Sequence, residues 1–380
     1  MHKFAGMLLP AFCVLAVASN AEAQEAVIKI GHVAPMSGGQ AHLGKDNEAG
    51  AKLAIEDLNK AGITIGGKKA KFVLVSEDDG ADPRQGTAVA QKLVDAKVVG
   101  VVGHLNSGTS IPASKIYYDA GIPQISPSST APKYTQQGFN TTFRVVANDS
   151  QLGARLGQYA VSQLKAKKVA VIDDRTAYGQ GVADEFSKAA KAAGAAIVAT
   201  QFTTDKATEF SAILTAVKSA APDVVFYGGM DAQAGPLLRQ MKQLGINAKL
   251  MGGDGICTEG LVNLAGDGMA DGQVICAEAG GVTGEEEKGM EAFRADFKKR
   301  TGGEVQLYAP YVYDAVMVLA DSIKKAGSAE PDRYLPYLAK ADYKGVTGRI
   351  SFDSKGDIKN GSLTLYSYKA GKRERIAVVK

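Results

Sequence analysis

The sequence has no tryptophan, few cysteines and few histidines, and it lacks a long hydrophobic run after its first residues. The four histidines are His2, His32, His42 and His104, and none has a partner at the spacing that builds a zinc site. We therefore expect no metal. Beyond the N-terminal segment, no stretch approaches the ~20 apolar residues that a membrane-spanning helix needs.

The signatures of nucleotide-binding and hydrolytic enzymes are also missing. The first apolar run continues as GHVAPMSGG, which is not the G-x-G-x-x-G of a dinucleotide fold, and neither G-x-x-x-x-G-K-[ST] nor G-x-S-x-G occurs. Because no base accompanies a candidate nucleophile, an enzyme is the weaker hypothesis, and we expect no cofactor.

The charge balance gives little sign of a nucleic-acid partner. Lysine and arginine number 44 against 40 acidic residues, and the only dense basic run is KRER at 372–375. We interpret that run as a solvated strand end and expect no nucleic-acid partner. We also expect the protein to be a monomer. The length of 380 residues suggests two domains, at ~100–200 residues each.

The N-terminus has the pattern of a secretory signal. MHK is followed by the apolar FAGMLLPAFCVLAVA and then by SNAEA, with Ala21 and Ala23 as the small residues of a cleavage site. Cys13 follows Phe12, whereas lipid attachment needs a small residue there. We predict that residues 1–23 form a signal peptide cleaved near Ala23 and that the mature chain is exported to the periplasm.

Two cysteines, Cys257 and Cys276, remain after that cleavage. An oxidising compartment would allow them to form a disulfide. The alternative is two buried free thiols, because the sequence does not show whether the two side chains meet.

Short β-branched runs alternate with longer segments of helical period from residue 27 onward. This alternation predicts α/β lobes with doubly wound parallel sheets covered by helices. The pattern breaks near 143–153, 276–284 and 358–363, which we interpret as three crossings that form a hinge. The predicted N-terminal lobe is 27–147 and 277–362, and the C-terminal lobe is 148–276 and 363–380. A cleft should lie between the carboxyl ends of their strands.

Two hydroxyl-rich loops follow apolar strands of the first lobe. GHLNSGTSIPAS at 103–114 contains Ser107, and PQISPSSTAPKYT at 123–135 contains Ser128, Ser129 and Thr130. We expect a helix to start immediately after each loop, so that backbone N–H groups and hydroxyls together favour an anion, a carboxylate better than a phosphate. The alternative is that these side chains only cap helices.

Three candidates stand at strand ends of the second lobe: Tyr178 in DDRTAYGQG, Met230 in FYGGMDAQ and Asp254 in MGGDGIC. A carboxylate between glycines suits an ammonium group, although Asp254 could instead cap a helix. An anion site in one lobe and an ammonium site in the other describe a zwitterion.

At this point the chain resembles a known family, the periplasmic leucine/isoleucine/valine-binding proteins that serve ABC importers. The resemblance extends over nearly the whole mature length. The matching stretches are IKIGHVAPMSGGQAHLG, EDDGADPRQGTAVAQKLV, GHLNSGTSIPAS, ISPSSTAPKYTQQG, AYGQG, DVVFYGGMDAQAGPLLRQ and AGDGMADGQV.

The resemblance implies a type I periplasmic binding protein fold that closes on an amino acid, branched-chain or aliphatic, and presents it to the membrane permease of an ABC importer. By position, Ser107, Ser128 and Thr130 correspond to contacts of the α-carboxylate and backbone. Tyr178 corresponds to the aromatic residue that covers the ligand, and Asp254 to the acid that binds the α-ammonium.

Several positions depart from the family pattern. Met230 stands where leucine-type binders often have a tyrosine, and Leu43 where they place an aromatic over the ligand side chain. Asp254 replaces the usual glutamate, and Ala81 and Asn106 occupy the positions of the enteric disulfide. The ligand could therefore be an amide or a short-chain or aromatic carboxylate. A ligand-sensing regulator of the same fold is a further alternative, although a secretion signal occupies the place of its DNA-binding domain.

Overall fold

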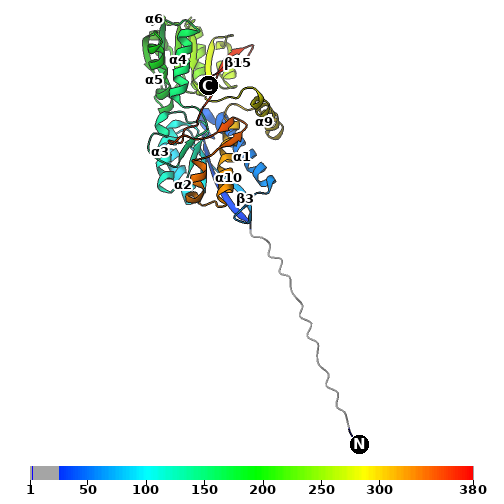
Figure 1. Ribbon diagram of the computed structural model, residues 1–380. Coiled ribbons are helices and arrows are strands. Elements are labelled where there is room, and N and C mark those ends of the chain that lie inside the picture. The colour runs from blue at the N-terminus through cyan, green and yellow to red at the C-terminus, as the bar shows by residue number, and fades with distance from the viewer. Residues whose placement is uncertain (1, 3–24, 380) are drawn as a thin grey trace.

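Two β-sheets organise the chain, one in each of two lobes that lie end to end (Figure 1). The computed structural model describes residue 2 and residues 25–379. The predicted signal peptide and its cleavage site fall, apart from His2, outside the described residues. Within the described part of the chain, every helix is too short or too polar to cross a membrane.

The first lobe contains a sheet of strand order β2-β3-β1-β4-β5-β6. Its strands are β1 (Ala26–Ala34), β2 (Thr64–Ile65), β3 (Lys68–Asp78), β4 (Gly100–Gly103), β5 (Gln124–Ser126) and β6 (Thr142–Arg144). The N-terminal part of the chain adds η1 (Gly38–Gln40), α1 (Ala41–Ala61), α2 (Pro83–Asp95), α3 (Ser107–Asp119) and η2 (Pro132–Tyr134). The chain returns later to add α9 (Glu285–Thr301), α10 (Ala309–Ala326), α11 (Pro331–Leu338) and the hairpin β12 (Tyr343–Gly345) and β13 (Gly348–Ile350).

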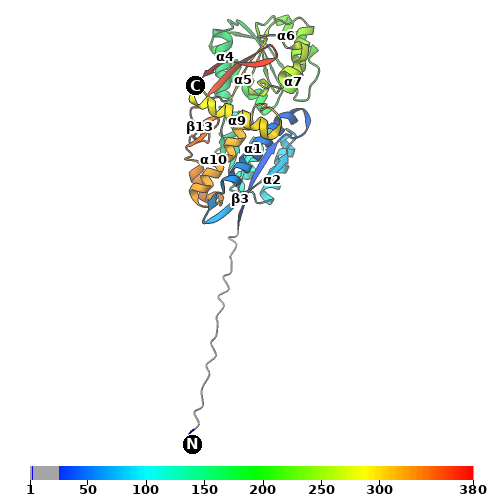
Figure 2. The same ribbon diagram turned by 90° about the vertical axis from the view of Figure 1, so that its right-hand side faces the viewer.

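The second lobe contains a sheet of order β15-β14-β11-β10-β9-β7-β8. Its strands are β7 (Lys168–Asp173), β8 (Ala196–Phe202), β9 (Val224–Gly228), β10 (Lys249–Gly252), β11 (Val274–Glu278), β14 (Leu363–Lys369) and β15 (Lys372–Val379). Its helices are α4 (Asp149–Ser162), α5 (Ala177–Ala192), α6 (Ser211–Ala220), α7 (Asp231–Gln243), α8 (Leu261–Ala265), η3 (Asp254–Ile256) and η4 (Gly266–Gly268). Figure 2 shows α4 to α7 in this lobe and α9 beside the junction with the other.

The predicted α/β architecture of two lobes is confirmed, with one correction at the sheet edges. The central strands of both sheets pair in parallel, but β2 is antiparallel to β3, and β14 and β15 are antiparallel to their neighbours. The β14–β15 turn has positive φ at Ala370 (48°) and Gly371 (72°). Positive φ at both residues of a two-residue turn matches the right-handed twist of the flanking strands, so the chain forms a hairpin here. The strand β15 therefore pairs antiparallel with β14.

The chain passes between the lobes three times, and the crossing segments lie side by side. The Ala147 N–H of the first crossing donates to the Ala279 carbonyl of the second at 3.0 Å. The Thr364 hydroxyl after the third crossing donates to the Gly280 carbonyl at 2.7 Å. The strand β11 stays in the second sheet as far as Glu278, beyond the boundary expected at residue 276. These short, mutually bonded segments form a narrow connection about which the lobes can rotate.

Candidate functional site

The first wall of the cleft is the loop between β4 and α3. Asn106 is the N-cap of α3 and Ser107 is its first residue, 1% exposed. The Ser107 Oγ accepts a hydrogen bond from the Ala131 N–H at 3.2 Å, which joins this loop to the second hydroxyl-rich loop. The first N–H groups of a helix have no partner within the helix, so the start of α3 offers donors and a partial positive charge.

The second hydroxyl-rich loop is bonded to the first through its serines. The Ser128 hydroxyl donates to the Leu105 carbonyl at 2.9 Å. The Ser129 hydroxyl pairs with Ser110 Oγ at 2.6 Å and also lies 3.1 Å from the Leu105 carbonyl. These bonds hold the end of the strand in place, and the role of Ser129 is therefore mainly structural.

The helix expected after this second loop is absent among the described residues, where a single 3-10 turn at Pro132–Tyr134 takes its place. The reason is the short distance along the chain to β6, which begins at Thr142 after a glycine at positive φ, Gly138 (82°). Only α3 therefore presents a helix N-terminus from the two loops, which corrects the expectation of two.

Asp254 forms the floor of the cleft in the second lobe, at the start of the turn after β10. It is 2% exposed, and its two oxygens accept hydrogen bonds from different lobes. The Tyr178 hydroxyl, from the first turn of α5, donates to Oδ1 at 2.9 Å. The Tyr308 hydroxyl, which precedes α10 in the first lobe, donates to Oδ2 at 2.9 Å. The carboxylate therefore connects the two lobes.

Asp254 is a buried carboxylate, and burial makes its charge costly unless a cationic partner is present. Burial raises the pKa of Asp254 to about 6, although the hydrogen bonds of Tyr308 and Tyr178 act in the opposite direction. Burial and the Asp254 charge raise the pKa of both tyrosines well above the usual 10, so both stay neutral donors. Around pH 7 and above, Asp254 is mostly an anion.

The glycines on either side of Asp254 allow this packing. A Cβ on Gly253 would lie 2.7 Å from the Tyr178 hydroxyl oxygen, and a Cβ on Gly255 would lie 2.8 Å from both the Tyr178 ring and the Met230 sulfur. Side chains at these two positions would push Tyr178 and Met230 away from the carboxylate. The space that the glycines leave is filled by these two residues.

A small cavity of about 10 Å³ lies where the two walls meet. That space holds roughly one water molecule. Five of the predicted site residues line it together, from both lobes, and the full lining is Leu105, Asn106, Ser107, Ser128, Tyr178, Met230, Asp254 and Tyr308.

A second, larger cavity of about 380 Å³ adjoins the first. Asn106, Tyr178 and Met230 line both cavities. Gln40 also lines the larger cavity, and its side-chain oxygen accepts a 2.8 Å hydrogen bond from the Asn106 amide. A movement of Tyr178 or Met230 would merge the cavities into a volume typical of small-molecule sites.

A second acidic residue, Asp149, is buried close to Asp254. It is the first residue of α4 and is 0% exposed. Its carboxylate faces the hydroxyl of Thr130, yet neither Asp149 oxygen nor Thr130 Oγ1 has a hydrogen-bond partner of good geometry within residues 25–379. Burial, with the nearby charge of Asp254, raises the pKa of Asp149 to about 8. Unpartnered buried polar groups are costly, so this pair is suited to a ligand that supplies a donor.

One predicted site residue lies outside the site, and two residues of the site were not predicted. Leu43 is 0% exposed and belongs to the apolar core of α1, and it lines neither cavity described above. Tyr308 and Asp149 were not among the predicted site residues. Tyr308 does not follow a strand, so the search for polar residues at strand ends could not find it. The polar residues Asn148 and Asp149 interrupt the sequence at the first crossing, and that interruption could have indicated Asp149.

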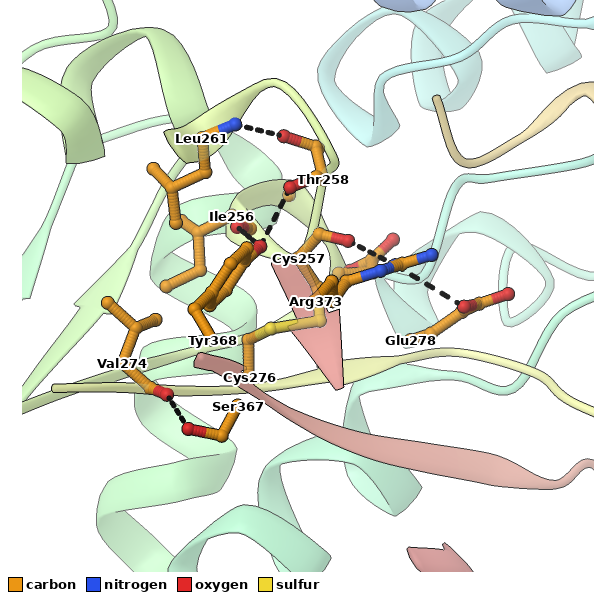
Figure 3. The surroundings of a disulfide bond; sticks show 12 residues. Ile256, Cys257, Thr258, Leu261, Val274, Cys276, Glu278, Ser367, Tyr368 and Arg373 are labelled. Carbon is orange, nitrogen blue, oxygen red and sulfur yellow. Dashed lines mark hydrogen bonds and ion pairs between the residues drawn. A yellow bond between two sulfur atoms is a disulfide. The ribbon is translucent and has the colours of Figure 1, made fainter. Parts of the chain in front are cut away.

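A disulfide joins Cys257 to Cys276, with the two Cα atoms 5.3 Å apart (Figure 3). It connects the end of the Asp254 turn to β11. The Arg373 guanidinium donates to the Cys257 carbonyl at 2.5 Å, and the Tyr368 hydroxyl donates to the Thr258 carbonyl at 2.7 Å. The loop after Asp254 is thus held to β11, β14 and β15 on one side. Within residues 25–379, no group of three acidic, histidine or cysteine side chains is arranged to hold a metal ion.

Known proteins share this architecture and sequence. The family model described as periplasmic binding protein matches residues 27–373. A Leu/Ile/Val-binding protein homolog 1 from Brucella abortus is 37% identical, with 97% of this chain and 96% of the relative covered. A leucine-, isoleucine-, valine-, threonine- and alanine-binding protein from Pseudomonas aeruginosa is 34% identical, with 96% and 94% covered.

Solved structures give the same result. The branched-chain amino acid transporter substrate binding protein LivJ from Streptococcus pneumoniae, in complex with isoleucine, superimposes with a TM-score of 0.83. It is 29% identical, and the match covers 93% of this chain and 99% of that one. The two-lobed fold and its cleft agree with the match of the family model over residues 27–373. The chain therefore belongs to the periplasmic binding protein family.

Proposed function

We propose that the protein binds an amino acid with an aliphatic side chain, branched-chain above all, between its lobes and delivers it unchanged to the membrane permease of an ABC importer. The observation that carries the proposal is the position of the buried Asp254 across a shared cavity from Ser107 and Ser128. An acid faces a helix N-terminus there, which is the complement of a zwitterion. The names of the relatives support the same class of ligand.

Each lobe contributes half of the site. The α-carboxylate binds to the N–H groups at the start of α3 and to the hydroxyls of Ser107 and Ser128. The α-ammonium binds to Asp254, and Thr130 and Asp149 supply further acceptors. Because neither half suffices alone, the ligand stabilises the state in which the lobes are together.

The ligand has to displace side chains on binding. A cavity of about 10 Å³ does not admit an amino acid, so the Tyr178 and Tyr308 hydroxyls give up their bonds to Asp254 in favour of the ammonium. Met230 and Tyr178 then move aside, and the aliphatic side chain enters the space of the larger cavity. Methionine is suited to this part because its unbranched side chain adapts to different shapes.

The cellular setting follows from the N-terminal segment and the cysteines. The segment 1–23 directs the chain to the periplasm and is cleaved near Ala23, and the periplasm is an oxidising compartment in which the Cys257–Cys276 disulfide persists. The protein acts there as a monomer that docks transiently on its permease.

The test is identification of the bound solute. Protein purified from the periplasm without denaturation is unfolded, and the released small molecules are identified by mass spectrometry. Calorimetric titration of stripped protein with branched-chain amino acids, their des-amino analogues, aromatic acids and amides then ranks the ligands. Branched-chain amino acids should bind best and be recovered unchanged. Tighter binding of the des-amino or aromatic acids, or of an amide, would replace the proposal by a binder of that class, and chemical conversion of the ligand would indicate an enzyme.

A further inference from the structure

His42 and Asp231 form an ion pair that joins the two lobes outside the cavity described above. The His42 Nε2 lies 2.8 Å from Asp231 Oδ2. His42 is in the first turn of α1 in the first lobe, and Asp231 is the first residue of α7 in the second. The two positions are 189 residues apart in sequence, so only the meeting of the lobes brings them together.

The carboxylate of this pair is deeply buried and specifically held. Asp231 is 0% exposed, and the Thr258 hydroxyl donates to the same Oδ2 at 2.5 Å. Its other oxygen, Oδ1, has no hydrogen-bond partner among the residues that the structure describes. The N-terminus of α7 favours the anion. Among the residues that the structure describes, His42 is the only cationic group paired with Asp231.

Residues of both lobes surround the pair. A Cβ on Gly260, at the start of α8, would lie 3.6 Å from the His42 ring and 3.7 Å from Asp231 Oδ2. The same Cβ would lie 3.6 Å from the Gln306 side chain of the first lobe. Elements of both lobes thus enclose the contact, while the His42 side chain remains 32% exposed and can exchange protons with solvent.

We propose that His42 and Asp231 form a latch between the lobes, which holds the cleft closed over its solute and makes solute binding tighter when His42 is protonated. The inference rests on the proposed function, because it concerns the closure that accompanies binding. Neither residue lines the cavity that holds the candidate subsites. Both are positioning residues that act on the distance between the lobes.

The charged groups near the latch determine the sign of its pH dependence. Burial alone lowers the pKa of His42, but the hydrogen bond and charge of Asp231, the charge of Asp46 and the Gly39 carbonyl outweigh it, so the pKa lies above its usual 6.5. Asp46 is bonded to backbone N–H groups of residues 306–309 in its own lobe and stays near His42 whether the lobes are open or closed. The remaining groups near Asp231 are the neutral hydroxyls of Thr258, Tyr227, Tyr308 and Tyr368.

Of the groups that raise the pKa of His42, only Asp231 belongs to the other lobe, so opening removes its contribution while Asp46 and Gly39 keep theirs. Opening also relieves part of the burial that lowers this pKa, and the latch requires the loss of Asp231 to outweigh that relief. A group whose pKa is higher in the closed state takes up a proton on closure, and its contribution is present at low pH and lost as the pH rises through the closed-state pKa. Ligand affinity should gain from the latch below neutral pH and lose that gain in mildly alkaline solution.

The test compares wild type with His42→Gln by calorimetric titration with the best ligand of the panel, at about pH 6 and about pH 8.5. Glutamine can keep a hydrogen bond to Asp231 but cannot titrate. Wild type should bind roughly three- to tenfold more tightly than the variant at the lower pH, and the ratio should fall towards one at the higher pH. The comparison cancels the titrations of Asp254 and Asp149, which both proteins share.

Two further measurements separate a latch from other causes. Titrations in buffers of different ionisation enthalpy count the protons taken up on binding, and wild type should take up more than His42→Gln near neutral pH. Asp231→Asn should remove the same pH-dependent difference, with no further loss when the two substitutions are combined. An affinity ratio that is independent of pH would overturn the latch. A loss from Asp231→Asn that is equal with and without His42→Gln would also overturn it and would assign Asp231 to the ligand itself.

The histidine can also be observed directly, which keeps the proposal testable if Asp231→Asn does not fold. Only His32, His42 and His104 follow the predicted signal peptide, and the His42→Gln spectrum identifies the signal of His42. Its pKa, measured by NMR with and without ligand, should be higher in the complex. An unchanged pKa would contradict the latch while solute binding stands, whereas absence of solute binding would contradict the proposed function instead.

Discussion

The Tyr308 hydroxyl of the first lobe donates a 2.9 Å hydrogen bond to the Asp254 carboxylate of the second. The other oxygen of the same carboxylate accepts from Tyr178, on its own lobe. The buried carboxylate therefore accepts hydrogen bonds from both sides of the cleft. A ligand ammonium that replaces the Tyr308 hydroxyl as the partner of Asp254 would change this contact between the lobes when it occupies the binding site.

Replacement of Asp254 by asparagine keeps the shape of the side chain and removes its charge. Loss of the charge-assisted hydrogen bond to the ammonium should weaken amino-acid binding by roughly 1.5–3 kcal/mol, about ten- to a hundredfold. Calorimetry of wild type and Asp254→Asn with an amino acid and its des-amino analogue forms a double-mutant cycle. The analogue should lose nothing or gain, because it never paired with the charge. A coupling energy of zero within error would remove Asp254 from the ammonium subsite.

Asp149 should make the ligand-free protein less stable as the pH rises. Its pKa in the folded state is about 8, far above that of an unfolded aspartate, so stability is full in acid and declines between about pH 4 and pH 8. Asp149→Asn removes this titration, and its stability should fall less over the same interval than that of wild type. Urea unfolding across that pH range measures the difference. If the unfolding free energy of the two proteins changed equally with pH, the pKa of Asp149 would not differ between the folded and unfolded states.

Arg144 supports the second hydroxyl-rich loop from beneath. It is 0% exposed, its Nε lies 2.6 Å from Asp357 Oδ1, and its guanidinium donates to the carbonyls of Ser129 (2.8 Å) and Ala131 (3.1 Å). Arg144→Met leaves Asp357 without this partner and should cost roughly 3–5 kcal/mol of unfolding free energy. Denaturant unfolding measures that loss.

A matched exposed pair provides the control for Arg144. Lys115 and Asp119 lie 2.6 Å apart on the solvent side of α3, with both side chains more than half exposed. Lys115→Met should therefore change stability by less than about 1 kcal/mol. Equal costs for the two substitutions would mean that burial of the Arg144 pair is unimportant.

The disulfide should stabilise the second lobe through the loop that it closes. Cys257 and Cys276 are separated by 19 positions, and a loop of that size corresponds to about 3 kcal/mol. The Cys257→Ala, Cys276→Ala double variant should lose about that much stability. Thiol alkylation of native periplasmic protein followed by intact-mass analysis tests the bond itself. Two alkylated thiols in unreduced protein would show that the bond does not form in the periplasm.

The sequence by itself determined the class of fold and the end of the sheets at which a ligand binds. Alternating strands and helices predict parallel sheets, and parallel strands bring their carboxyl ends to one edge. For that reason Ser107, Tyr178 and Asp254 could be placed in one cleft before their distances were known. The antiparallel pairing of β14 with β15 was missed because the hairpin turn at 370–371 was not taken into account.

The tertiary structure alone decided what lies across the cleft and how closely. Tyr308 is 54 positions from Asp254, and His42 is 189 positions from Asp231. Such contacts depend on how the lobes are rotated about three crossings, which no local pattern specifies. The Cys257–Cys276 bond, which the sequence left open, lies within the second lobe and depends instead on the pairing of β10 with β11. Local periodicity fixes which residues face the cleft, whereas the packing of one lobe against the other fixes which of them touch.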